Sequence, residues 1–353
     1  MSSLAAASPA LSDVSYVLPI RGPVEVDTQL AAYVAWLSER VDVVIADGST
    51  PDVFDLHRRL WGPGVRHLAV TSRCLNGKVA GVVDGVLAAT CERVVVADDD
   101  VRYDNAALRE IAALLDHHDV VRPQNYFSPL SWHARWDSAR SLVNRAWGQD
   151  YPGTVGIRRS SFVEAGGYCG GVLFENLELL RTMAAHGHRI HDAPDLVVRR
   201  VPPGARHFVQ QRLRQAYDSL AQPGRLAVEL CIVPVTAAVL MRVRPWRTAA
   251  VCVGVGCAAA VATAEGGRRR GAARHVFGWT SSWWAPAWVA ERGMCSWLAV
   301  LTRFRGGVVY GGVRLSTAAH STVQLASGSC RDRDCGCRTP LVLAPRPRTR
   351  DRA

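Results

Sequence analysis

Three consecutive aspartates follow a short apolar run, and they are the residues of this chain best suited to chemistry. Asp98, Asp99 and Asp100 stand directly behind residues 94–97, Val-Val-Val-Ala, which predict a buried strand. Ligands of open α/β sheets bind just beyond the carboxyl ends of such strands. Three neighbouring carboxylates repel one another unless a positive charge lies among them. The pattern therefore indicates a site for a hard cation, Mg2+ or Mn2+, which prefers oxygen ligands and can carry a nucleotide diphosphate.

A second interpretation of the three aspartates is structural. Acidic residues are common at helix starts, and a helix is expected to begin near Asp104. The aspartates would then form an acidic turn that caps this helix. Taken alone, they do not decide between a helix cap and a metal site.

Five other segments carry characteristic residues, and their order along the chain is informative. They are Tyr-Val-Leu-Pro-Ile at 16–20, Asp-Gly-Ser at 47–49, Asn-Gly-Lys at 76–78, Phe-Glu-Asn-Leu-Glu at 174–178 and Gln-Gln-Arg-Leu-Arg at 210–214. Together with the aspartates, this order resembles glycosyltransferase family 2, the inverting nucleotide-sugar transferases with a GT-A fold. The resemblance covers residues 15–220 and favours the metal site over the cap.

The resemblance assigns roles to the aspartates. Asp98 and Asp100 fit the family's metal motif, in which two aspartates flank one residue. Residues two apart on an extended segment point the same way. We expect Asp100 to contact the metal directly and Asp98 to support the metal or the ribose, with Asp99 among the donor-binding residues. The metal, Mn2+ or Mg2+, would offset charge on the departing diphosphate.

Four further residues are expected at the donor. By the resemblance, Asp47 contacts the base or ribose, and a carboxylate can accept hydrogen bonds from both. Asp-Gly-Ser is also ordinary turn chemistry. Lys78 is expected near the phosphates, and Gln211 and Arg214 belong to a motif that contacts the diphosphate, which suits the guanidinium fork. A basic amphipathic helix at a membrane surface is the alternative for that motif.

The catalytic base is expected to be a glutamate. An inverting transfer needs one carboxylate to take the proton of the acceptor hydroxyl. The family usually places an aspartate after a glutamate, but here Asn176 follows Glu175, and Glu178 comes next. An amide cannot act as a base, so Glu175 or Glu178 must serve. We favour Glu175 because it lies nearest the glycine-containing loop at 170–172. An acidic pair at a helix N-terminus is the structural alternative.

Strand-like and helix-like segments alternate through residues 14–222 and would position these side chains. Strands are expected at 15–20, 41–46, 65–70, 93–97, 120–121, 153–157 and 196–201, and helices at 27–40, 52–61, 78–89, 106–115, 132–147, 162–165, 175–186 and 206–220. This alternation predicts an α/β domain with a mostly parallel sheet. The resemblance implies that this domain is a GT-A, or nucleotide-diphospho-sugar transferase, fold.

Residues 223–305 are expected to form membrane-associated helices. Apolar stretches lie at 226–241, 249–264 and 276–301, and the last is rich in tryptophan, which suits a membrane interface. Each of the first two falls slightly short of the ~20 residues of a usual span. Two or three short spans and a partly immersed platform both remain open. Residues 306–329 form a C-terminal segment, and residues 1–13 and the Cys/Arg-rich tail at 330–353 are predicted to be disordered.

The net charge of +11 comes mostly from arginine, which clusters after the apolar stretches. Such clusters fit an anionic membrane surface, and without any nucleic-acid motif we expect no nucleic-acid partner. Residues 1–13 lack the basic flank and apolar core of a signal peptide. The expected location is therefore the cell membrane, with the catalytic domain in the cytoplasm.

These observations predict a metal-dependent inverting glycosyltransferase at the membrane. It would move a sugar from a nucleotide-diphosphate sugar, expected to be a UDP-sugar, to a hydroxyl of a lipid, lipid-linked or glycan acceptor. Two alternatives stay open. A nucleotidyltransferase acting on sugar phosphates would need a glycine-rich basic loop, of which residues 19–23 supply little. A non-catalytic membrane protein that retains the fold would be consistent with Asn176.

Overall fold

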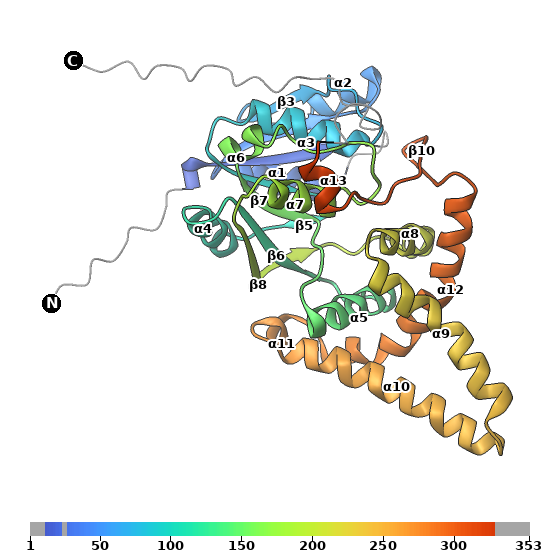
Figure 1. Cartoon of the computed structure of the whole chain (residues 1–353). Helices are drawn as coiled ribbons and strands as arrows, with labels where there is room; N and C mark the ends of the chain where they lie inside the picture. Colours follow the sequence, from blue (N-terminus) through green and yellow to red (C-terminus); the bar gives the residue numbers. More distant parts are fainter. Residues whose placement is uncertain (1–10, 23–26, 329–353) are drawn as a thin grey trace, which may run out of the picture.

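The computed structural model describes residues 11–22 and 27–328 of the 353-residue chain. It contains a sheet with helices on both faces and a group of C-terminal helices, from which a long helical hairpin projects (Figure 1). Leu11–Asp13 was predicted to be disordered with the rest of residues 1–13, but it forms a 3-10 helix. The predictions of disorder for residues 1–10 and for the tail at 330–353 lie outside the described residues.

One eight-stranded sheet occupies the centre of the domain, in the order β3-β2-β1-β4-β7-β6-β8-β5. Its strands are β1 (Val14–Ile20), β2 (Asp42–Asp47), β3 (Val65–Ala69), β4 (Arg93–Ala97), β5 (Val101–Arg102), β6 (Val120–Phe127), β7 (Thr154–Arg158) and β8 (Ile190–Arg200). The pairs β1–β2, β1–β4, β2–β3 and β6–β8 are parallel. The predicted α/β class and mostly parallel sheet are thus confirmed.

The second half of the sheet is more mixed than the alternating pattern predicts. β7 lies between β4 and β6 and is antiparallel to both, and β5 is antiparallel to β8. β8 begins at Ile190, earlier than the predicted strand at 196–201. Pro194 lies inside β8 and Pro123 inside β6, where the register shifts between Arg122 and Gln124. Prolines within strands obscure the strand pattern because proline cannot donate to the ladder.

Eight helices complete this domain within the described residues. They are α1 (Thr28–Ser38), α2 (Pro51–Arg58), α3 (Gly77–Ala88), α4 (Asn105–Leu114), α5 (Trp132–Trp147), α6 (Arg159–Glu164), α7 (Glu175–Ala185) and α8 (Ala205–Tyr217). Asp27, Asn76, Asp104 and Ser131 cap α1, α3, α4 and α5 by accepting hydrogen bonds from backbone N–H groups.

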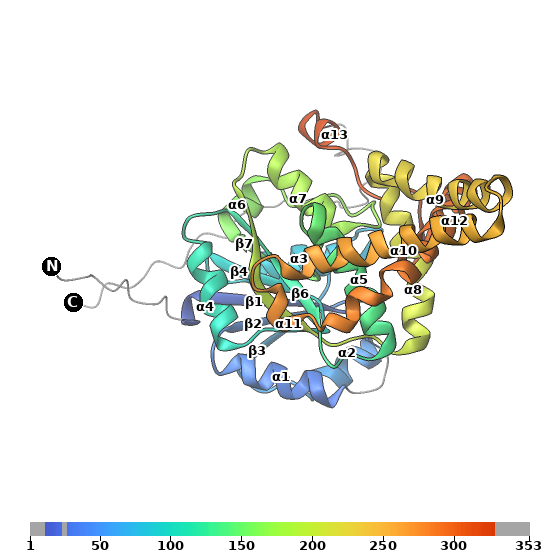
Figure 2. The same ribbon diagram turned by 90° about the horizontal axis from the view of Figure 1, so that it is seen from below.

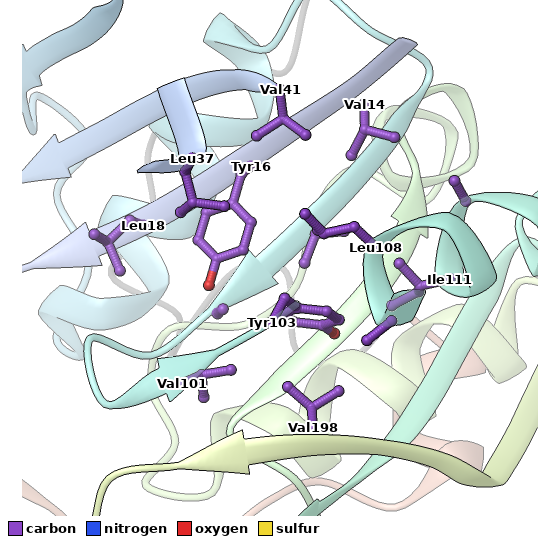
Figure 3. Packing of buried hydrophobic residues seen from close by; sticks show 14 of the residues in the cluster. Val14, Tyr16, Leu18, Leu37, Val41, Val101, Tyr103, Leu108, Ile111 and Val198 are labelled. Atoms are coloured by element: carbon purple, nitrogen blue, oxygen red, sulfur yellow. The ribbon is translucent and has the colours of Figure 1, made fainter. Parts of the chain in front are cut away.

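Apolar side chains fill both faces of the sheet. On β1, Tyr16 and Leu18 point to one face and Val17 to the other, as the two-residue period of a strand requires. Tyr16 packs with Leu37 of α1 and Leu108 of α4 (Figure 3). Val17 packs on the opposite face with side chains of α3, α6 and α7. The two cores hold the strand ends in place relative to one another.

The chain after α8 forms helices that lie beside the sheet domain and then returns to it (Figure 2). These elements are a 3-10 helix (Asp218–Ala221), α9 (Pro223–Arg242), α10 (Trp246–Arg269), α11 (Ala273–Val276), a second 3-10 helix (Trp279–Trp284) and α12 (Ala285–Phe304). Within the described residues, α9 and α10 are long and apolar enough to cross a membrane, and most of their side chains are exposed. The hairpin of β9 (Val308–Tyr310) and β10 (Val313–Leu315) and then α13 (Thr322–Ala326) follow, and α13 packs on α7.

Gly85 lets α3 lie close to β1, and a substitution at Gly85 tests this packing. A Cβ atom at this position would come within 2.4 Å of Cγ1 of Val17, a buried side chain. We expect Gly85→Ala to destabilise the protein by about 1–3 kcal/mol, seen as a lower melting temperature. Gly224→Ala in α9 is the control, because a Cβ there meets nothing within 4 Å. Equal melting temperatures for Gly85→Ala and the control would contradict this packing.

Candidate active site

A cavity of about 810 Å3 opens where the parallel strands end. Ile20 of β1, Gly48 after β2, Val70 after β3 and Asp98 after β4 all line it. Its other walls come from the start of α7, from α8, from the segment 218–225, from α12 and from the β9–β10 hairpin. The carboxyl edge of the sheet is the place where open α/β sheets bind ligands.

The three aspartates line this cavity and do not cap a helix. Asp104 caps α4, whereas Asp98–Asp100 lie between β4 and β5. Two basic side chains face them. The Lys78 ammonium lies 2.5 Å from Oδ1 of Asp98, and Arg200 donates from Nε to both oxygens of Asp100 at 2.9 and 2.8 Å. Arg200 also reaches Oδ2 of Asp98 at 3.2 Å. The structural alternative considered for this segment is therefore wrong.

The pKa values of the three aspartates are shifted in different directions because their surroundings differ. Burial would raise the pKa of Asp98, but Lys78 and Arg200 together lower it. Burial raises the pKa of Asp100, and the charge of Arg200 offsets only part of that rise. Confinement in the cavity, with Asp100 and Asp98 alongside, raises the pKa of Asp99 to about 6. No described residue forms a hydrogen bond or ion pair with the Asp99 carboxylate, so this end of the cavity holds an excess of negative charge.

Lys78, the only lysine in the chain, links the aspartates to α7. Its ammonium lies 2.5 Å from Asp98 and 2.5 Å from Oε1 of Glu175, the first residue of α7. Asn76 fixes the start of α3, because its side chain accepts a hydrogen bond from the Lys78 N–H and donates one to the Val172 carbonyl. Burial alone would lower the pKa of Lys78, but Asp98 and Glu175 raise it well above its usual value.

Asp47 lies just behind the cavity wall. Its side chain accepts hydrogen bonds from the Ser49 N–H at 2.9 Å and pairs with His57 at 2.7 Å and His67 at 3.0 Å. Burial would raise the pKa of Asp47, but these hydrogen bonds, that of His67 first, lower it below its usual range. Gly48 lines the cavity and Asp47 does not. Asp47 therefore shapes the loop at the cavity rather than presenting its carboxylate there.

Glu178, the other candidate for the base, and Asn176, which stands where the family usually has an aspartate, lie in different places. Glu178 is fully buried and points away from the cavity, where it accepts hydrogen bonds from the backbone and Nδ1 of His320, both at 2.7 Å. Ligand atoms of Cys169, Glu178 and His320 lie within 4.8 Å of one another, so this group could also hold a metal ion. Asn176 lines the cavity and donates to the Pro152 carbonyl at 2.9 Å.

Helix α8 brings Gln211 and Arg214 to the cavity. The Gln211 amide contacts His207 one turn earlier. The Arg214 guanidinium lies 5.1 Å from the ring centroid of Tyr310 in the β9–β10 hairpin, and no described carboxylate forms an ion pair with it. Arg212 points the other way and pairs with Asp137 at 2.8 Å. Of the two arginines in this segment, Arg214 is the one available to a ligand.

The cavity also holds charged residues that were not predicted, and three of them show how such residues arise. Arg200 ends the last long strand, Asp218 follows α8, and Arg292 interrupts the tryptophan-rich apolar stretch of α12. A charged residue at the end of a strand or inside an apolar helix can be recognised in the sequence as a candidate functional residue. The sequence does not show that these three residues meet in one cavity, since they lie far apart in the chain.

The Lys78 contacts can be tested by amine labelling. An amine reacts only when it is deprotonated, and each unit by which the pKa rises lowers that fraction about tenfold. We expect Lys78 to be acetylated at pH 8 at least roughly tenfold more slowly than a free lysine peptide, as measured by mass spectrometry. Glu175→Gln should speed the reaction, whereas Glu178→Gln should not. Labelling of Lys78 at the rate of the free peptide would contradict the two ion pairs.

The chain matches no protein-family model and no curated protein. Solved structures that match it include a mannosyltransferase from Pyrobaculum calidifontis in complex with GDP-Man and Mn2+, with 20% identity, a TM-score of 0.47, and coverage of 81% of this chain and 87% of that chain. A glucosyl-3-phosphoglycerate synthase from M. tuberculosis matches with 16% identity, a TM-score of 0.39, and coverage of 58% and 78%. A mannosyl-3-phosphoglycerate synthase from Rubrobacter xylanophilus has 14% identity, a TM-score of 0.39, and coverage of 60% and 75%. Identities and TM-scores this low assign no function to this chain.

Proposed function

We propose that this protein is a membrane-associated glycosyltransferase that uses a nucleotide-diphosphate sugar. One observation carries the proposal: a single cavity at the carboxyl edge of the sheet gathers Asp98–Asp100, Lys78, Glu175, Gln211 and Arg214. By the resemblance, Glu175 was expected to be the catalytic base, and the other residues of this group were expected at the donor or the metal. Carboxylates for a metal and an arginine for a diphosphate are the groups that such a donor requires.

The nucleotide would lie against the loops that follow β1 and β2. Ile20, Arg21 and Gly48 form this wall of the cavity, and Ser49 Oγ accepts a hydrogen bond from the Gly22 N–H at 3.0 Å. Asp47 would act through Ser49, as a positioning residue that holds the loop in place. Arg214, with no partner among the described carboxylates, would donate to the diphosphate.

The donor set also fits a divalent metal. Asp99 offers a carboxylate with which no described residue pairs. Burial, and next the charges of Asp100 and Asp98, raise the pKa of Asp99, and a cation bound there would offset these charges. Asp98 and Asp100 would hold Mn2+ or Mg2+ while sharing their oxygens with Lys78 and Arg200. When bound, the metal would neutralise charge on the departing diphosphate. Lys78 and Arg200 would hold the carboxylates of Asp98 and Asp100 in position through their ion pairs.

Asp218 is the better candidate for the base than either glutamate. Glu175 is held by Lys78, and Glu178 is buried against His320. Asp218 lines the same cavity, and no described residue donates a hydrogen bond to its carboxylate. Burial, and next the charge of Glu175, raise the pKa of Asp218 to about 7, although Arg214 opposes the rise. A base works best when its pKa lies near the operating pH. Asp218 would take the proton of the acceptor hydroxyl as that oxygen attacks the sugar and inverts its anomeric centre.

The apolar helices would hold this cavity at the membrane. Exposed apolar side chains of α9, α10 and α12 include Val235, Leu240, Val251, Trp297 and Leu301. An exposed apolar surface of this kind marks an interaction site. We infer that it contacts lipid, with the sheet domain on the cytoplasmic side. A lipid or lipid-linked acceptor could then reach the cavity from the bilayer.

Release of nucleoside diphosphate tests the proposed activity. Membranes containing the protein are incubated with a panel of nucleotide sugars, lipid extract, and Mn2+ or Mg2+. We expect release with one donor, its loss in EDTA, and a loss of at least about a hundredfold in Asp100→Ala. Asp55→Ala, an exposed change on α2 outside the cavity, is the control. No release with any donor would contradict the proposal, and pyrophosphate released from a nucleoside triphosphate would favour a nucleotidyltransferase.

The role of Asp218 predicts a pH profile. The base must be deprotonated, so the rate should rise tenfold per pH unit below about 7 and level off above it. Asp218→Asn should lower the rate by roughly 10²–10⁴-fold and remove this limb, with donor affinity retained. Glu178→Gln should keep the limb at pH 7. An Asp218→Asn enzyme with the wild-type profile would assign the base elsewhere.

A further inference from the structure

Arg292 is a fully buried charge without a hydrogen-bond partner. Its side chain is 1% exposed, and Nε and both terminal nitrogens lack an acceptor among the described residues. Its nearest aromatic neighbour is Trp288, whose ring centroid lies 5.7 Å from the guanidinium carbon. Burying a guanidinium without acceptors is strongly unfavourable, and native proteins satisfy nearly all such groups. A missing anionic ligand would account for this arrangement.

The surrounding charges leave Arg292 free to bind an anion. Glu229 is engaged by Arg225 at 2.8 Å and by Ser296 at 2.7 Å. Glu291 accepts from the Trp136 indole at 2.9 Å and lies 3.5 Å from Arg212. Both glutamates attract Arg292 at longer range but form no hydrogen bond with it.

Arg292 is buried in the wall of the cavity rather than in a separate closed interior. Arg292 and Arg225 line the same cavity as Asp218. The charges of both arginines act on Asp218, so the three side chains lie in one region. An anion bound there would lie next to the carboxylate that is proposed to take the proton of the acceptor.

We propose that Arg292 and Arg225 bind a phosphate group of the acceptor, and that this phosphate belongs to a lipid. That the bound molecule is the acceptor rests on the proposed transferase function, whereas the proposal that this site binds a lipid phosphate does not. Arginine forks suit phosphate oxygens, to which they donate paired hydrogen bonds. Arg225 lies in the first turn of α9, and Arg292 lies in α12, which packs on α9.

The placement of these arginines favours a lipid phosphate over a soluble one. Along α12, the exposed side chains after Arg292 are apolar except for Arg303 near the end of the helix; the apolar ones are Met294, Trp297, Leu298, Leu301 and Phe304. On α9, Val228, Val233 and Val235 follow Arg225 and are also exposed. A phosphate held between the two arginines would leave its hydrocarbon chain beside these apolar surfaces.

Binding to the full-length protein in detergent, without donor, tests this site. The probes are farnesyl phosphate, farnesol and inorganic phosphate, and the dissociation constant is measured for each. We expect farnesyl phosphate to bind most tightly. We expect Arg292→Met to weaken it at least roughly tenfold, because a charge-assisted pair of hydrogen bonds is lost. Arg292→Lys should keep part of the affinity. Since an unpaired buried charge disappears, Arg292→Met should also raise the melting temperature.

Arg225→Gln is a second variant, in case Arg292→Met does not fold. Its control is Arg242→Gln at the far end of α9, an exposed arginine outside the cavity, which should bind farnesyl phosphate as the wild type does. Equal binding of farnesol, or unchanged affinity in both cavity variants, would overturn the site. Inorganic phosphate binding as tightly as farnesyl phosphate would overturn the lipid origin. Binding needs no turnover, so an inactive protein that still binds farnesyl phosphate would contradict only the transferase function.

Discussion

The cavity depends on a balance of charge at the end of β4. Three aspartates meet at one sheet edge, and they stay together because Lys78 and Arg200 face them from α3 and β8. Lys78 also binds Glu175, so the same ammonium ties the aspartate turn to the start of α7. Opposite charges in a partly buried site hold their geometry well, since salt and water screen them less than at the surface. The positions of α3, α7 and β8 around the cavity are therefore coupled through these few ion pairs.

Much of the proposed donor side of the cavity could be predicted from sequence, because its residues lie at the ends of short, strongly patterned elements. Asp98–Asp100 follow a buried strand, and Lys78 and Glu175 open helices, so both position and chemistry could be read locally. The α/β class followed from the same alternation. The antiparallel β7 and the early start of β8 could not be read, because prolines and charged residues interrupt these strands and pairing direction is set by long-range contacts. The sequence alone also could not show that the carboxylate of Asp47 lies behind the cavity wall and not in the cavity.

The proposed acceptor side of the cavity could not be predicted from sequence, for a different reason. Asp218, Arg225 and Arg292 come from three elements of the helical region, and Tyr310 comes from a hairpin beyond it. None of these elements has a local pattern that points to the others. In the sequence, the charged residues of α12 only interrupt an apolar stretch. Their role depends on which surface of the folded protein they face. Only the folded structure shows that Arg292, which interrupts the apolar stretch of α12, forms part of the cavity wall.

The return of the chain after α12 limits how this protein can be shortened for study. Tyr310 and Gly311 line the cavity, and the Gly311 carbonyl accepts a hydrogen bond from Arg21 at 3.3 Å. The β9–β10 hairpin therefore forms part of the same cavity as the loop after β1. Ending the chain before α9 would remove one side of the pocket together with the apolar helices. The far ends of α9 and α10 meet at residues 243–245 and contribute nothing to the cavity. A soluble form should therefore be engineered by trimming the tip of this hairpin and rejoining it, and not by truncating the C-terminus.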